Sequence, residues 1–176
     1  MQKVSYRTIY VRARPGFRTQ GWLIAGRSQV PVALGRGSIR ANKREGDGGT
    51  PRGRFRLLRL WWRADRAPRP RTLLPVRRIG RSHGWCENPA DRRYNRPIIV
   101  PEGTPGDRLW RADDLYDFII EIDHNTCPRV AGRGSAVFIH IARPGFKPTA
   151  GCVALEAGRL LRLLERVGPK TRIEIQ

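Results

Sequence analysis

Two residues in the last third of the chain have side chains suited to covalent chemistry. The stretch FIHIARPGFKPTAGCVAL, residues 138–155, places His140 in an apolar run and Cys152 directly after Gly151. A cysteine attacks as a thiolate, and a nearby imidazole or the positive end of a helix lowers its pKa. Gly151 leaves room for a substrate carbonyl, and adjacent backbone N–H groups can hold the oxyanion. The pair predicts acyl transfer through a thioester, with a buried thiol and a core imidazole as the open alternative.

The segments around the pair determine whether the two side chains can meet. In residues 135–141, alternation sends Val137, Ile139 and Ile141 to one side and Phe138 and His140 to the other, so we expect His140 to face a cleft. An eleven-residue connector, IARPGFKPTAG, with two prolines and two glycines, can fold back to set Cys152 beside this strand.

One segment has a helical period, and we expect this helix to begin just after Cys152. Apolar residues recur at i, i+3, i+4 and i+7 before Gly168 and Pro169 end the run, and they are Leu160, Leu163, Leu164 and Val167. A helix start at this place would direct its positive end at the thiol.

The other periodic segments are short runs bounded by Gly or Pro, which is typical of strands. They are residues 6–13, 21–26, 30–35, 53–62, 116–123, 135–141 and 171–175. We find no internal repeat and no linker long enough to divide the chain, and 176 residues is the size of one domain. The sequence therefore predicts a single domain, mainly β with one or two helices, with antiparallel or mixed strands.

A second constellation points to a different class of protein. His83 and Cys86, and likewise His124 and Cys127, form two H-x-x-C pairs with the spacing of zinc knuckles. Together with the charge of the chain, they suggest a zinc-stapled, nucleic-acid-binding protein without catalysis. This is the alternative to the acyl transfer hypothesis.

Charge and composition limit the partners and the location. The formal charge is +20 and the pI is near 11.6, which favours an anionic partner such as nucleic acid, anionic lipid or cell-wall polymer. The arginines are scattered, so we interpret most of them as solvated surface. No apolar run reaches the length of a membrane span, and the odd number of three cysteines suggests reduced thiols. The start of the chain has no signal-peptide pattern, so we expect a cytoplasmic protein, or a periplasmic one if the chain was trimmed.

Several stretches together resemble the L,D-transpeptidase catalytic domain family, also called the YkuD domain, over nearly the whole chain. GDGGTPRGRFRL is similar to the family's Thr-Pro-x-Gly-x-Phe segment, here Thr50, Pro51, Gly53 and Phe55. GSAVFIH and TAGCVAL resemble its histidine strand and its Gly-Cys motif. GWCENPADRRYNRPI and YDFIIEIDHN resemble a short, signal-less proteobacterial subgroup.

The resemblance implies a β-sandwich of mixed sheets and an enzyme that needs no cofactor. It implies that Cys152 is the nucleophile, that His140 is its base, and that the carbonyl of Ile141 orients the imidazole. The implied substrate is a peptidoglycan stem peptide or muropeptide, in which Cys152 attacks the carbonyl of the L-centre of a tetrapeptide and releases D-alanine. An amine that takes the acyl group gives a crosslink, and water gives a trimmed stem.

The chain departs from the family pattern near Cys152. Thr149 and Ala150 stand where the family has Ser/Thr-His, and Ala154 stands where it has Arg or Asn. Other groups must then contact the substrate, and the candidates are Arg143, Thr149, Tyr94, Asn95, His83 and Trp85. The missing signal peptide tilts the prediction towards water, and so towards an L,D-carboxypeptidase. Nucleic acid is not expected as a partner, and the sequence says nothing about oligomeric state.

Overall fold

The computed structural model describes residues 5–101, 103 and 107–176. The elements of these residues are β1 (Thr8–Arg14), β2 (Phe17–Ala25), β3 (Ser28–Ala33), β4 (Ile39–Arg40), β5 (Thr50–Pro51), β6 (Gly53–Trp62), β7 (Val76–Arg78), β8 (His83–Trp85), β9 (Pro97–Ile99), β10 (Asp107–Arg108), β11 (Phe118–Ile122), β12 (Phe138–Ile141), a 3₁₀ turn (Pro144–Phe146), β13 (Val153–Leu155), α1 (Ala157–Leu164) and β14 (Arg172–Ile175). The prediction of a mainly β fold is confirmed.

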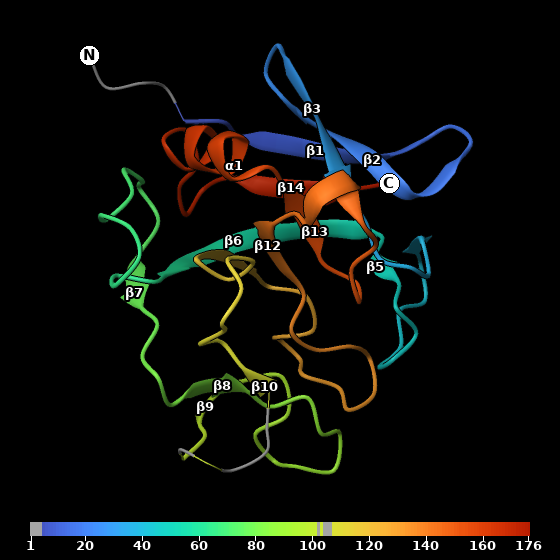
Figure 1. The fold of residues 1–176 in the computed structure, drawn as a ribbon. Helices are drawn as coiled ribbons and strands as arrows, with labels where there is room; N and C mark the ends of the chain where they lie inside the picture. The colour runs from blue at the N-terminus through green and yellow to red at the C-terminus, as the bar shows by residue number, and fades with distance from the viewer. Residues whose placement is uncertain (1–4, 102, 104–106) are drawn as a thin grey trace.

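The main sheet is mixed and closes on itself. Its order is β11-β12-β13-β3-β2-β1-β14-β6-β7, and β11 also pairs with β6, which returns the circuit to its start. The pairs β1–β14, β12–β13 and β6–β7 are parallel, and the other pairs are antiparallel. In Figure 1, β1, β14 and β6 cross the molecule one below the other, with α1 beside β1. The small sheet β10-β8-β9 lies at the opposite end from α1.

The closed sheet surrounds the larger apolar core. Alternation directs Ile9 and Val11 of β1 and Ile173 and Ile175 of β14 into this core, where each is at most 1% exposed. Leu160, Leu163 and Leu164 of α1 complete it, as the helical period predicts.

The predicted start of the helix is wrong. Cys152 is followed by β13, and α1 begins only at Ala157 and ends at Leu164. β13 pairs with β12 and β3, and its residues Val153, Ala154 and Leu155 are all buried. A strand covered on both faces has no alternation that would distinguish it from the first turn of a helix.

A second, aromatic cluster lies towards the small sheet. It contains Trp61, Ile79, Trp85, Leu109, Ile119, Phe138 and Cys152. Phe138 and Trp85 meet edge to face, with ring centroids 4.9 Å apart. Val137, Ile139 and Ile141 of the neighbouring positions belong to the larger core, so the predicted division of residues 135–141 between two sides is confirmed.

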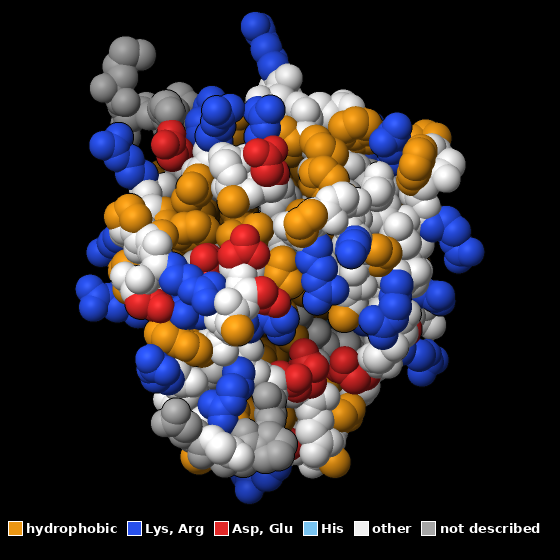
Figure 2. Space-filling view, viewed as in Figure 1, with side chains coloured by type: hydrophobic (Ala, Val, Ile, Leu, Met, Phe, Trp, Pro, Cys, Tyr) orange, Lys and Arg blue, Asp and Glu red, His pale blue; other side chains and the backbone are white. Residues whose placement is uncertain are grey.

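The surface carries basic side chains throughout. Figure 2 shows Lys and Arg side chains over much of the displayed face, with fewer Asp and Glu side chains scattered among them. In the described residues, none of the helices has the length and apolar character needed to cross a membrane.

Candidate active site

His140 lies on β12, Cys152 lies directly before the adjacent strand β13, and both line the same cavity. The parallel pairing of β12 with β13 sets Ile139 opposite Val153 and His140 opposite Ala154, and Cys152 directly precedes β13. Each of the two side chains is 6% exposed, and both border a cavity of about 500 Å³. The connector between them therefore folds back as the sequence predicts.

The imidazole of His140 is oriented by the backbone. Its Nδ1 lies 2.8 Å from the carbonyl oxygen of Ile141, so Nδ1 carries the proton and donates it to that oxygen. Nε2 then has a free lone pair. Burial lowers the pKa of His140 to about 4, so the ring is neutral at pH 7 and can accept a proton. The ring of Tyr116 meets it edge to face at 5.3 Å.

The thiol of Cys152 is held by backbone groups of Ala136 and Phe138. Sγ donates to the carbonyl oxygen of Ala136 at 3.3 Å and accepts from the N–H of Phe138 at 3.4 Å. Burial raises the pKa of Cys152 to about 12. The expectation of a resting thiolate activated by a helix end is therefore wrong, because the buried thiol lies in front of a strand. In the described part of the chain, no hydrogen bond joins Sγ to the imidazole.

The loop before the thiol is braced by Thr149. Its Oγ1 donates to the carbonyl oxygen of Cys152 at 2.7 Å and accepts from the N–H of Gly151 at 3.1 Å. The backbone of Thr149 is tied in turn to Leu34 and Arg36, with N–H to oxygen distances of 2.9 Å in both cases. The Gly151 amide is therefore engaged inside the loop, and the N–H of Cys152 is the other candidate oxyanion donor next to the thiol.

Gly151 has a conformation and a position that only glycine fits. Its φ is +143°, a region that residues with a side chain rarely adopt. A Cβ added there would lie 2.8 Å from the carbonyl oxygen of Gly49. The loop that contains Gly49 is thus packed directly against the backbone before Cys152.

The wall of the 500 Å³ cavity is strongly basic. Arg36, Arg111, Arg143 and Lys147 all border it, and only Arg143 was singled out from the sequence. Arg111 is paired with Asp113 at 2.6 Å and lies over the ring of Tyr116 at 5.1 Å. Arg36, Arg111 and Lys147 come from loops, where no periodic pattern marks a residue as functional.

A second cavity, of about 410 Å³, adjoins the first. Arg111 and Tyr116 border both cavities, and Ala136 and Phe138, which bind the thiol, line the second one. Its wall also includes Trp85, Glu87 and Asp107. Burial, together with the charge of Asp107 and a hydrogen bond to it, raises the pKa of Glu87 to about 8. Cys152 therefore lies between a basic cavity and a more acidic one.

Three of the candidates from the sequence do not reach either cavity. The amide of Asn95 accepts from Trp85 Nε1 at 3.0 Å and from the N–H of Ala136 at 3.1 Å, and it donates to two carbonyl oxygens, so it is fully engaged. Tyr94 Oη donates to Glu45. His83 Nδ1 accepts from the N–H of Gly80 at 2.8 Å. Asn95 thereby holds Trp85 and Ala136, which line the second cavity.

The two H-x-x-C pairs do not assemble. Within residues 5–101, 103 and 107–176, no three His, Cys, Asp or Glu side chains are placed to hold a metal ion. His83 binds Gly80, and His124 Nε2 lies 3.0 Å from the carbonyl oxygen of Arg133. Cys86 is buried whereas Cys127 is exposed. The interpretation of the two pairs as one zinc site is therefore wrong.

Comparison with known proteins assigns the chain to a family. A closed β fold with a buried Cys/His pair at a basic cavity defines a candidate cysteine acyltransferase. The sequence model of the L,D-transpeptidase catalytic domain, YkuD, matches residues 11–175. The chain belongs to this family of cysteine enzymes, which acts on peptidoglycan. Searches of the curated proteins and of the solved structures gave no significant match.

Proposed function

We propose that the protein transfers an acyl group from the peptidoglycan tetrapeptide stem through Cys152. Sγ attacks the carbonyl carbon between the L-centre and the terminal D-alanine. The C–N bond breaks, D-alanine leaves, and the tripeptide acyl group remains on sulfur as a thioester. The observation that carries this proposal is that the thiol and an imidazole with a free Nε2 line one cavity.

His140 moves the proton in this proposal. Because the thiol and the imidazole are both neutral at rest, the thiol must rotate away from Ala136 and pass its proton to Nε2 as the S–C bond forms. The imidazolium then gives this proton to the nitrogen of the leaving D-alanine. Ile141 keeps Nδ1 protonated throughout, which prevents the wrong tautomer.

The charges around the thiol fit a donor with several carboxylates. Arg36, Arg111, Arg143 and Lys147 border the space into which the stem would extend. The N–H of Cys152 is the proposed oxyanion donor, since Thr149 engages that of Gly151. Arg36, Arg143 and Lys147 are exposed and lie in loops, so these cations can meet an entering carboxylate.

The fate of the thioester separates two forms of the proposal. Transfer to water gives a tripeptide and makes the protein an L,D-carboxypeptidase that trims muropeptides in the cytoplasm. Transfer to an amine gives a crosslink and requires action in the periplasm. Cell fractionation together with product analysis distinguishes these two forms.

The test is intact-mass spectrometry of the protein mixed with a disaccharide-tetrapeptide, with and without a primary amine. We expect a tripeptide acyl adduct and released D-alanine with the wild type. Cys152→Ala should abolish both, and Cys127→Ala, which changes an exposed thiol, should abolish neither. Undiminished release of D-alanine by Cys152→Ala would show that the proposal is wrong.

A further inference from the structure

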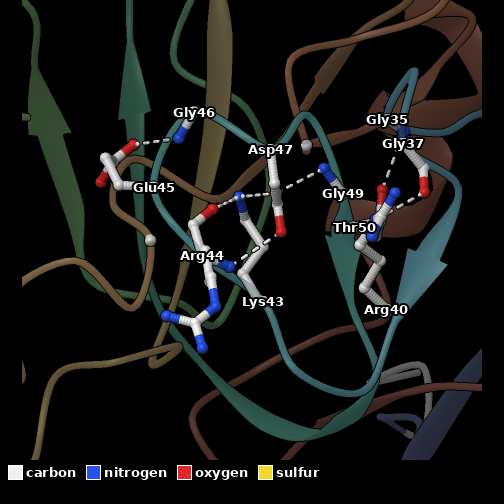
Figure 3. A network of polar contacts seen from close by, with 12 residues as sticks. Gly35, Gly37, Arg40, Lys43, Arg44, Glu45, Gly46, Asp47, Gly49 and Thr50 are labelled. Atoms are coloured by element: carbon white, nitrogen blue, oxygen red, sulfur yellow. Dashed lines mark hydrogen bonds and ion pairs between the residues drawn. The ribbon is translucent and has the colours of Figure 1, made fainter.

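A buried ammonium group lies in the loop that packs against Gly151. The side chain of Lys43 is 6% exposed, and lysine is rarely buried unless it is paired. Nζ donates to Asp47 Oδ1 at 2.7 Å and to the carbonyl oxygen of Arg44 at 2.8 Å. Figure 3 shows these contacts within residues 43–49, with Lys43 and Asp47 directed towards each other.

The loop fixes the position of the Asp47 carboxylate in this pair. Asp47 also accepts from the N–H groups of Arg44 at 2.8 Å and Gly49 at 2.7 Å. Although burial raises the pKa of Asp47, the hydrogen bonds from Lys43 and from the two N–H groups hold that pKa below its usual value. Three donors on one carboxylate leave it little freedom to move, and the position of Lys43 Nζ is fixed with it.

The aliphatic stem of Lys43 lies beside the nucleophile loop. Its Cε is 3.6 Å from the position that a Cβ would take on Gly151 and 3.0 Å from that on Gly134. Gly134 and Gly151 both have positive φ, which favours glycine, and the absence of a Cβ at both positions leaves room for the Lys43 side chain. Burial is the largest effect on the pKa of Cys152 and raises it, the N–H of Phe138 lowers it, the charge of Glu87 raises it, and the charge of Lys43 also lowers it.

We propose that Lys43 is a positioning residue, whose buried ammonium stabilises the thiolate of Cys152 and the negative charge that develops during attack. A fixed charge at a buried position acts more strongly than one in water and needs no reorganisation during the reaction, and its pairing with Asp47 reduces its field at the thiol. The inference rests on the proposed function only for the role of Cys152 as nucleophile. Its test needs no peptidoglycan, so the two proposals fail separately.

Other ionisable groups face the thiol and must be held constant in the test. Tyr116 and His140 lie on one side, Glu87 with Asp107 lies in the second cavity, and the cations of the first cavity are Arg36, Arg111, Arg143 and Lys147. The variants below leave all of these groups unchanged.

The experiment measures the rate at which neutral iodoacetamide alkylates Cys152, between about pH 7 and pH 9, with peptide mapping to separate the three cysteines. Below the pKa of the thiol this rate follows the thiolate fraction, so one pKa unit changes it about tenfold. Lys43→Met should slow alkylation by up to about tenfold. Asp47→Asn should speed it, because the ammonium loses its counter-charge. Lys170→Met, at an exposed position, should leave it unchanged.

The opposite changes in alkylation rate expected for Lys43→Met and Asp47→Asn distinguish an electrostatic role from a purely structural role in the loop. If Lys43 and Asp47 only hold the loop together, both variants slow or speed the reaction alike, and that result would overturn the inference. An unchanged rate in Lys43→Met would do the same. Should Lys43→Met not fold, the double variant Lys43→Met/Asp47→Asn removes both charges and must still react more slowly than the wild type.

Discussion

Thr149 offers a sharp test of whether the nucleophile loop is braced from within. Thr149→Val keeps the shape of the side chain and removes its oxygen, which binds the carbonyl oxygen of Cys152 at 2.7 Å and the N–H of Gly151 at 3.1 Å. Thr149→Ser keeps both hydrogen bonds and removes only a methyl group. The pair of variants therefore isolates the two bonds.

The size of the effect follows from these two contacts. In Thr149→Val, loss of each hydrogen bond leaves one backbone group of a buried residue without its partner. Each loss lowers the free energy of unfolding by about 1 kcal/mol where water can partly replace the hydroxyl, so the two together lower it by about 2 kcal/mol. For a chain of this size the melting temperature then falls by about 4 to 8 °C. The turnover number for D-alanine release should also fall, because the backbone of Cys152 is no longer held.

The assay is thermal unfolding followed by circular dichroism, together with D-alanine release at saturating tetrapeptide. Thr149→Ser should stay near the wild type in both measurements. If Thr149→Val unfolds at the wild-type temperature and raises only KM, then Thr149 is a substrate contact, as the sequence suggested, and the reasoning about the brace fails.

Two further predictions concern residues around the thiol. Gly151→Ala should destabilise the protein by about 1 to 3 kcal/mol in denaturant titration, because Gly151 has a positive φ and lies close to the backbone of Gly49. Gly158→Ala in α1, where an added Cβ meets open space, should stabilise the protein slightly. Equal effects of the two variants would contradict this prediction. The raised pKa of Glu87 predicts that a carboxyl neutral in the folded state becomes charged through about pH 8 and opposes the thiolate. In the wild type, the rate of Cys152 alkylation should therefore rise less than tenfold per pH unit above pH 8. In Glu87→Gln, the rate should rise by the full tenfold per pH unit. The wild type should also lose stability relative to this variant as the pH rises from the usual carboxyl pKa to about 8, since only the unfolded carboxyl is free to ionise there; a constant difference would count against it.

The sequence alone was sufficient where the signal is local and periodic. Alternation in residues 135–141 assigned His140 and Phe138 to one side, and alternation near the C-terminus assigned Ile173 and Ile175 to the core. Both assignments follow from the two-residue period of a strand, which needs no knowledge of the partner strand. The motif around Cys152 led to the same family as the comparison over residues 11–175.

Only the tertiary structure decided properties that depend on neighbours distant in the chain. The three residues after Cys152 form β13 because β12 and β3 enclose them, and no local pattern distinguishes them from a helix. Burial reverses the expected charge state of the thiol, and a pKa follows from the surroundings of a group and not from its sequence spacing. Lys43 and Tyr116 reach Cys152 from loops that lie more than thirty residues before it in the chain, so their contribution exists only once the closed sheet has brought those loops together.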